Sequence, residues 1–142
     1  EGVEAYGYTF GQTILAPCSG QVIDRVNTIP DNPPRQTARD QGPGNYIVIE
    51  KEQDQYVVLA HLKQNSIQVE VGEQVTVGQS IAQCGKSGFV TEASLFLVVF
   101  DKPNVFDPRS RSQMIFFEGV KLLGTSDPEG VYYPQRGDYF IP

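Results

Sequence analysis

Closely spaced turn residues constrain the fold of this chain more than any other feature. The 142 residues include 14 glycines and 10 prolines, distributed at short intervals along the sequence. Glycine adopts positive φ without steric cost and proline interrupts regular structure, so this spacing leaves little room for long helices. The segments between these residues are rich in β-branched and aromatic side chains, which favour strands. The sequence therefore predicts an all-β fold, a compact sandwich or barrel with long surface loops.

Several segments have the composition of strands. The runs NYIVIEKE (45–52) and QYVVLAHL (55–62) are joined by polar residues, which predicts a hairpin. The segment SIQVEVGEQV (66–75) alternates between apolar and polar residues. We expect it to form a strand with these residues on one face: Ile67, Val69 and Val71. Two later strands are expected, within GVKLLG (119–124) and GVYYP (130–134).

Two segments have the composition of loops. Residues 28–44 contain four prolines and two glycines, and residues 101–113 contain two prolines that break any strand. Long loops in compact domains are often functional.

The charge of the chain excludes some classes of partner. With 11 Lys and Arg against 17 Asp and Glu, the formal net charge is -6. An acidic domain repels phosphate backbones and anionic lipid, so we expect no nucleic acid and no membrane surface as partner. No apolar run approaches the roughly 20 residues of a transmembrane helix, and no signal-peptide pattern is present. Because the chain starts at Glu1 and not at Met, we expect a trimmed or processed product.

An ordered series of short motifs runs along the chain: ILAPCSGQVI, GNYIVIE, YVVLAHL, VEVGEQVTVGQSIAQCGKSG and TEASLFLVV. The series resembles the M23 family of zinc metallopeptidases, the lysostaphin/LytM-like peptidoglycan endopeptidases. The resemblance implies a duplicated hybrid β-motif and a single domain over residues 1–142, with its core at about 11–100 and a C-terminal extension at 101–142. It also implies a bacterial-type location outside the cytoplasm, in the periplasm, the cell envelope or the secreted space.

The residues expected to bind zinc are missing from this chain. Active members of the family use a His and an Asp from an early H-x(n)-D motif and the second His of an H-x-H motif, and such a site keeps an open position for water. The resemblance places Ser94 and Phe96 at the two H-x-H histidines, and residues 1–10 contain no histidine. Phenylalanine cannot bind a metal. We therefore expect no metal site and no cofactor, the zinc of active relatives having been lost.

The only histidine, His61, corresponds to the A-H-L histidine of the family, which assists catalysis and does not bind zinc. Since His61 cannot hydrolyse a peptide bond alone, no residue is assigned a catalytic role. The resemblance predicts a groove lined by these residues: Asn45, Tyr46, His61 and Ser94. Phe96 is expected to point inward and fill the space of the metal, within a strand (LFLVVF) buried on both faces.

Three functions remain open at this stage. The first is a catalytically degenerate module that binds a cell-wall peptide or glycan, or an envelope protein. The second is an active zinc-dependent endopeptidase whose missing ligands come from an upstream segment or another subunit. The third is a purely structural module. A lipoyl- or biotinyl-type carrier is disfavoured, because Lys86 in CGKSG lacks the flanking residues of a carrier lysine.

Cys18 and Cys84 are the only cysteines. They are either two small, partly buried thiols or one disulfide, which the extracytoplasmic location of the family would permit. A thiol nucleophile formed by Cys18 and His61 has no support in the sequence.

Overall fold

A computed structural model of the chain describes residues 6–52, 54–104 and 107–118 and three short strands at 121–122, 131–132 and 140–141. These residues form two compact units, Glu1–Ser112 and Gln113–Pro142. The predicted boundary between core and extension, near residue 100, falls inside the first unit. In the described part of the chain, no helix is long and apolar enough to cross a membrane.

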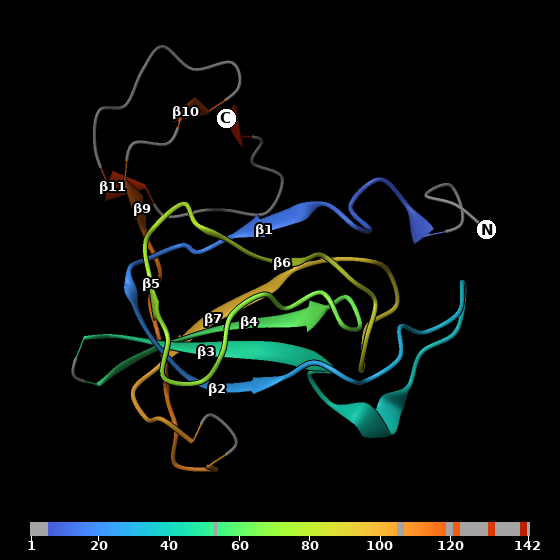
Figure 1. Ribbon diagram of the computed structural model, residues 1–142, viewed down its shortest axis with the longest axis horizontal. Helices are drawn as coiled ribbons and strands as arrows, with labels where there is room; N and C mark the ends of the chain where they lie inside the picture. The colour runs from blue at the N-terminus through green and yellow to red at the C-terminus, as the bar shows by residue number, and fades with distance from the viewer. Residues whose placement is uncertain are drawn as a thin grey trace. The chain divides into compact units, whose positions relative to one another are not determined.

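The regular secondary structure of the described residues is β-strand apart from one short 3-10 helix, which confirms the predicted all-β class (Figure 1). A short 3-10 helix, η1, spans Arg39–Gln41. The strands are, in chain order, β1 (Thr13–Leu15), β2 (Gly20–Val26), β3 (Asn45–Glu52), β4 (Gln55–Leu62), β5 (Gln74–Val75), β6 (Ser80–Gln83), β7 (Phe96–Phe100), β8 (Ser112–Gln113), β9 (Phe117–Glu118), β10 (Lys121–Leu122), β11 (Val131–Tyr132) and β12 (Phe140–Ile141).

The largest sheet has six strands in the order β5-β2-β3-β4-β7-β8. Its centre is the predicted hairpin, in which β3 pairs antiparallel with β4 from Glu52 opposite Gln55 back to Asn45 opposite Leu62. Strand β7 adds to the other edge of β4, with Phe96 opposite Ala60. The start of β3, the end of β4 and the start of β7 therefore lie together at one end of the sheet. Strands β10 and β11 lie within the two segments predicted at 119–124 and 130–134.

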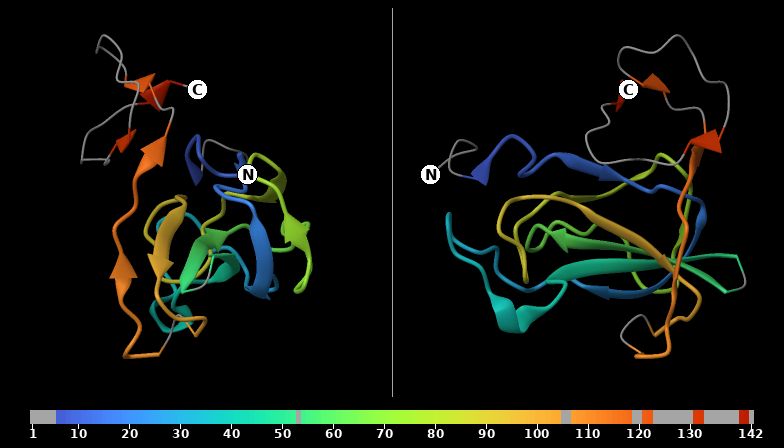
Figure 2. Two further views of the ribbon diagram at one scale, coloured as in Figure 1. Left: turned by 90° about the vertical axis from the view of Figure 1, so that its left-hand side faces the viewer. Right: turned by 180° about the vertical axis from the view of Figure 1, so that it is seen from behind.

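The main core lies between one face of this sheet and the two-stranded sheet of β1 and β6, which covers it (Figures 1 and 2). Strands β3 and β4 contribute alternate side chains to it, as expected for a sheet. The most fully buried of its large side chains are Ile47, Ile49, Leu59, Leu62 and Ile81. Because the central strands also bury residues on their opposite face, they are apolar along most of their length.

A second cluster lies on the opposite face of the sheet. It consists of alternate residues of the hairpin, and Val98 and Phe100 of β7 pack against it. The buried members are Tyr46, Val48, Tyr56, Val58 and Ala60. Phe96 belongs to the same face by the period of two along β7.

The strand expected over 66–75 is largely absent. Ile67 and Val69 are buried as predicted, but only Gln74–Val75 forms a strand and Val71 is 57% exposed. A turn closed by the bond from the N–H of Glu73 to the carbonyl of Glu70 reverses the chain there. Apolar alternation therefore predicted the burial of Ile67 and Val69 correctly, was wrong for Val71, and overestimated the length of the strand.

Candidate functional site

His61 occupies a β-bulge at the end of β4. Asn45 pairs with Leu62 and Tyr46 with Ala60, so His61 is an extra residue without a partner on β3. Its φ is +63°, a value that residues other than glycine seldom adopt. Its N–H donates to the carbonyl of Pro43 (3.0 Å), and its carbonyl accepts from the N–H of Gly85 (3.1 Å). The bulge thus joins the end of β4 to the first loop and to the segment after β6.

The imidazole of His61 has a fixed orientation. Its Nδ1 lies 2.9 Å from the carbonyl oxygen of Ser87. A carbonyl oxygen can only accept, so Nδ1 carries the proton and Nε2 of the neutral ring is an acceptor. Burial lowers the pKa of His61, while hydrogen bonds with Ser87 and Pro43 act in the opposite direction. The site therefore holds a neutral, half-buried imidazole with one defined lone pair.

Phe96 lies next to this imidazole but does not point inward. The centroids of the two rings are 6.0 Å apart with the planes tilted by 58°, within the usual range for aromatic pairs. The side chain is 51% exposed, so the prediction of an inward-pointing Phe96 is wrong. The physical reason is its position at the first residue of β7, where the sheet ends. The rest of β7 is partly buried on both sides, with Leu97 and Val99 against the main core.

Ser94, the other position at which the resemblance expects a histidine, is exposed. Its hydroxyl donates to the carbonyl of Glu92 (3.3 Å), two residues earlier in the same turn. Leu95 between the two positions is 38% exposed. Residues 94–96 therefore form an exposed, partly apolar rim.

Asn45 was predicted to line the groove and is instead fully buried. Its Oδ1 accepts from the N–H of Ile29 (2.8 Å), and its Nδ2 donates to the carbonyls of Ile29 (2.7 Å) and Leu62 (3.0 Å). Each of these partners is a backbone group that a buried site must satisfy. Asn45 thus joins the first loop to the end of the hairpin. The prediction that it lines a groove is wrong, and its role is structural.

Tyr46 is also largely buried, with 9% of its surface exposed. Its hydroxyl donates to Oδ2 of Asp24 (2.8 Å) across β2 and β3. Burial, and then the hydrogen bond and charge of Asp24, raise the pKa of Tyr46 to about 12. The phenol therefore stays protonated near neutral pH and acts as a donor to Asp24.

The described residues do not fit a zinc site. A hydrolytic zinc needs three nitrogen, sulfur or carboxylate ligands that converge on one point. In the described ranges no three His, Cys, Asp or Glu side chains gather in this way. The residue beside His61 at the position of the expected zinc ligand is Phe96, and its side chain is a hydrocarbon ring.

Both cysteines are free thiols, Cys18 half-buried and Cys84 buried, so the disulfide alternative is not realised in the structure. Burial raises the pKa of each thiol; Lys51 partly opposes this for Cys18, and Asp31 adds to it for Cys84. Neither is an activated nucleophile, because a raised pKa disfavours the thiolate.

Sequence reasoning missed the residues that hold the first loop in place. Asp31 accepts from the backbone N–H groups of Lys86 (2.6 Å) and Gln64 (3.0 Å). The Lys86 side chain, only 2% exposed, donates to the carbonyls of Pro33 (2.8 Å) and Gln36 (2.9 Å). The sequence marks Lys86 only as a disfavoured carrier lysine, and Asp31 has no sequence signal besides its place in IPDNPP.

Two glycines allow this loop to approach the segment after β6. Gly44 and Gly88 both have positive φ, of +66° and +80°. A Cβ atom at Gly44 would overlap the backbone of Ser87, and one at Gly88 would overlap the backbone of Gly44. Only glycine fits at both positions, which brings the loop against residues 86–88.

The fold and this site define a class of protein: a small antiparallel β-domain with a histidine on a bulge at the end of its central hairpin. The family model for peptidase family M23 matches residues 2–108, more than half of the chain. The chain therefore belongs to peptidase family M23.

Solved structures show the same fold. The catalytic domain of a point mutant of EnpA, a prophage-encoded M23 protein from Enterococcus faecalis, is 22% identical with a TM-score of 0.53, over 70% of this chain and 67% of that one. LytU is 25% identical with a TM-score of 0.50, over 63% and 54%. Lysostaphin is 23% identical with a TM-score of 0.51, over 76% and 38%.

This chain thus spans about half of LytU and less than two fifths of lysostaphin. A comparison with curated proteins found no match.

Proposed function

We propose that this domain is a non-catalytic M23-like module outside the cytoplasm that binds a cell-wall peptide or glycan, or an envelope protein. The groove it would use contains His61 and Phe96. The observation that carries the proposal is the half-exposed Phe96 ring at the expected zinc-ligand position, 6.0 Å from the imidazole. A hydrocarbon ring cannot supply the lone pair that zinc requires.

The same pair of side chains suits a binding surface. Binding sites combine apolar contact area with a few directed polar groups that fix orientation. The exposed ring of Phe96 offers apolar contact area. The Nε2 of His61 offers a directed acceptor, because Nδ1 is bonded to the carbonyl of Ser87. A ligand with an apolar face and one N–H or O–H group would meet both.

Zinc content and peptidoglycan cleavage test whether the module is non-catalytic. The purified full chain is expected to hold less than stoichiometric zinc and to release no soluble fragments from peptidoglycan. One tightly bound zinc per chain, or cleavage that a chelator abolishes, would contradict the proposal and support the hydrolase alternative.

Binding is tested by co-sedimentation with purified peptidoglycan. We expect Phe96→Ala to remove the chain from the pellet. Val77→Ala is the matched control, because Val77 is also an exposed apolar residue (61%) but lies on a turn after β5. Equal sedimentation of the Phe96→Ala variant and the parent chain would rule out the groove as the binding surface for peptidoglycan.

A further inference from the structure

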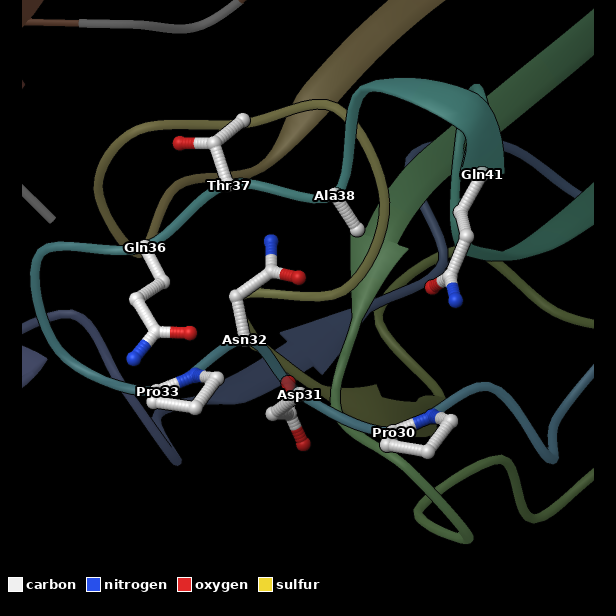
Figure 3. Close-up of a pocket in the computed structure, with 8 residues that line it drawn as sticks. All are labelled: Pro30, Asp31, Asn32, Pro33, Gln36, Thr37, Ala38 and Gln41. Carbon is white, nitrogen blue, oxygen red and sulfur yellow. The ribbon is translucent and has the colours of Figure 1, made fainter.

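A separate pocket lies inside the first loop, away from His61. It has a volume of about 270 Å³ and is lined by residues 30–33, 36–38 and 41 (Figure 3). Pockets for drug-sized ligands span roughly 300–1,000 Å³, so this one suits a smaller molecule.

The segment 86–88 separates this pocket from His61. Asn32 donates through its backbone N–H to the carbonyl of Lys86 (3.0 Å) and through its side chain to the carbonyl of Gly88 (2.7 Å). The carbonyl between them, of Ser87, is bonded to His61 instead. Successive carbonyls of an extended segment point to opposite edges. Asn32 and His61 therefore lie on opposite edges of this segment.

The side chain of Asn32 has an unused acceptor directed into the pocket. Asn32 is only 5% exposed. Its Nδ2 is bonded to Gly88, and no other described residue is hydrogen-bonded to its Oδ1. Among the described residues no fully buried side-chain polar atom lacks a partner, so Oδ1 must contact the open space of the pocket. Figure 3 shows the amide pointing between Thr37 and Ala38, with its oxygen on the Ala38 side.

Two further amides lie on opposite sides of the pocket, those of Gln36 and Gln41 (Figure 3). Neither side chain is hydrogen-bonded to another described residue. Each amide offers both a donor and an acceptor, as does a peptide group. The pocket therefore presents one buried acceptor flanked by two donor–acceptor pairs.

The two charged side chains that hold this loop, Asp31 and Lys86, already have hydrogen-bond partners. Both carboxylate oxygens of Asp31 accept backbone N–H groups, from Lys86 and Gln64. The ammonium of Lys86 donates to two loop carbonyls. A charged ligand would find no free counter-charge among these groups, and burying an unpaired charge is costly. The lining also contains no aromatic ring on which a base or a sugar face could stack.

We propose that this pocket binds a short uncharged peptide, with one peptide N–H donating to Oδ1 of Asn32 and the neighbouring amide groups bonded to Gln36 and Gln41. The pocket is preorganised for this role, because Lys86 holds the carbonyls of Pro33 and Gln36. Preorganisation lowers the entropic cost of binding. The proposal concerns a different site from the Phe96 groove and does not depend on it.

Titration of the ¹⁵N-labelled full chain with acetyl-Ala-Ala-amide tests the pocket. We expect saturable shifts of the side-chain amide signals of Asn32, Gln36 and Gln41. The double variant Gln36→Ala/Gln41→Ala loses two flanking hydrogen bonds and should weaken binding by about tenfold or more. Gln74→Ala, which removes an exposed amide on β5, is the matched control and should bind as the parent chain does.

Three results would overturn the proposal: no saturable shift of these signals, unchanged affinity in the double variant, or stronger binding of N-acetylglucosamine or acetate at the same signals. Loss of peptidoglycan sedimentation in Phe96→Ala concerns the groove alone, and the shifts of the Asn32, Gln36 and Gln41 signals concern the pocket alone, so the two proposals fail separately.

Discussion

Two residues at the same end of the large sheet reverse the usual distribution of polarity. Asn45, at the start of β3, is polar and fully buried, whereas Phe96, at the start of β7, is apolar and half exposed. Asn45 can be buried because its amide is bonded to three backbone groups. Phe96 gains only part of the free energy that burial of its ring would provide. One residue is therefore needed for the fold, and the other is available for binding.

The largest expected effect is that of Asn45→Leu. The variant leaves the N–H and carbonyl of Ile29 without their partner, whereas the carbonyl of Leu62 still accepts from the hydroxyl of Ser87 (2.6 Å). Each unsatisfied buried group costs about 1–3 kcal/mol, so we expect a loss of at least about 2 kcal/mol in the free energy of unfolding. Urea denaturation measures it. Gln74→Leu, which also replaces an amide side chain by leucine but at an exposed position, should remain within about 0.5 kcal/mol. A loss below about 1 kcal/mol for Asn45→Leu would remove the contrast with Phe96.

The next effect is that of Lys86→Met. Methionine keeps the apolar stem but loses the bonds to the carbonyls of Pro33 and Gln36. We expect the free energy of unfolding to fall by about 1–3 kcal/mol. Relative to the parent chain, amide hydrogen exchange should accelerate more in the first loop (28–44) than in the β3–β4 hairpin. Lys51→Met, at an exposed position, serves as control. Unchanged exchange across 28–44 would show that Lys86 does not hold the loop.

A smaller effect is expected for Phe96→Ala. Because the ring is half exposed, its removal should cost about 1 kcal/mol or less. Leu59→Ala, on the neighbouring strand and 1% exposed, should cost about 2–5 kcal/mol. Chemical denaturation of both variants compares them. If Phe96→Ala destabilised the domain as much as Leu59→Ala, Phe96 would be a core residue and its proposed binding role would lose its basis.

The smallest effect concerns pH. Burial lowers the pKa of His61 in the folded chain, so as pH falls below the ordinary value of about 6.5 the unfolded chain takes up the proton first. The stability from a neutral His61 is therefore complete above that pH and is lost as pH falls through the lowered folded pKa. His61 is the only histidine.

Comparison with His61→Asn isolates this contribution, and asparagine tolerates the positive φ at this position. Unfolding measurements between about pH 7 and pH 5 should show a steeper loss for the parent chain. Parallel curves for the two proteins would contradict the lowered pKa of His61.

The family resemblance placed His61 in a groove and Phe96 at the position of a zinc ligand. In the structure the two side chains are neighbours because β4 and β7 pair, with Ala60 opposite Phe96. The orientation of Phe96 was predicted wrongly, because an apolar run does not reveal where the sheet ends. The burial of Asn45 was missed for a related reason: its partners, Ile29 and Leu62, come from segments distant in the sequence.

Local sequence was sufficient for the all-β class and the β3–β4 hairpin. Turn residues and β-forming runs act over a few positions, and that range is enough to place strands. The polarity of the site depends on contacts between distant segments: the loop at 28–44, the bulge at His61 and residues 84–88. Whether a polar side chain is buried depends on the backbone groups that such contacts bring to it, so folding alone made Asn45 a structural residue and left Phe96 exposed.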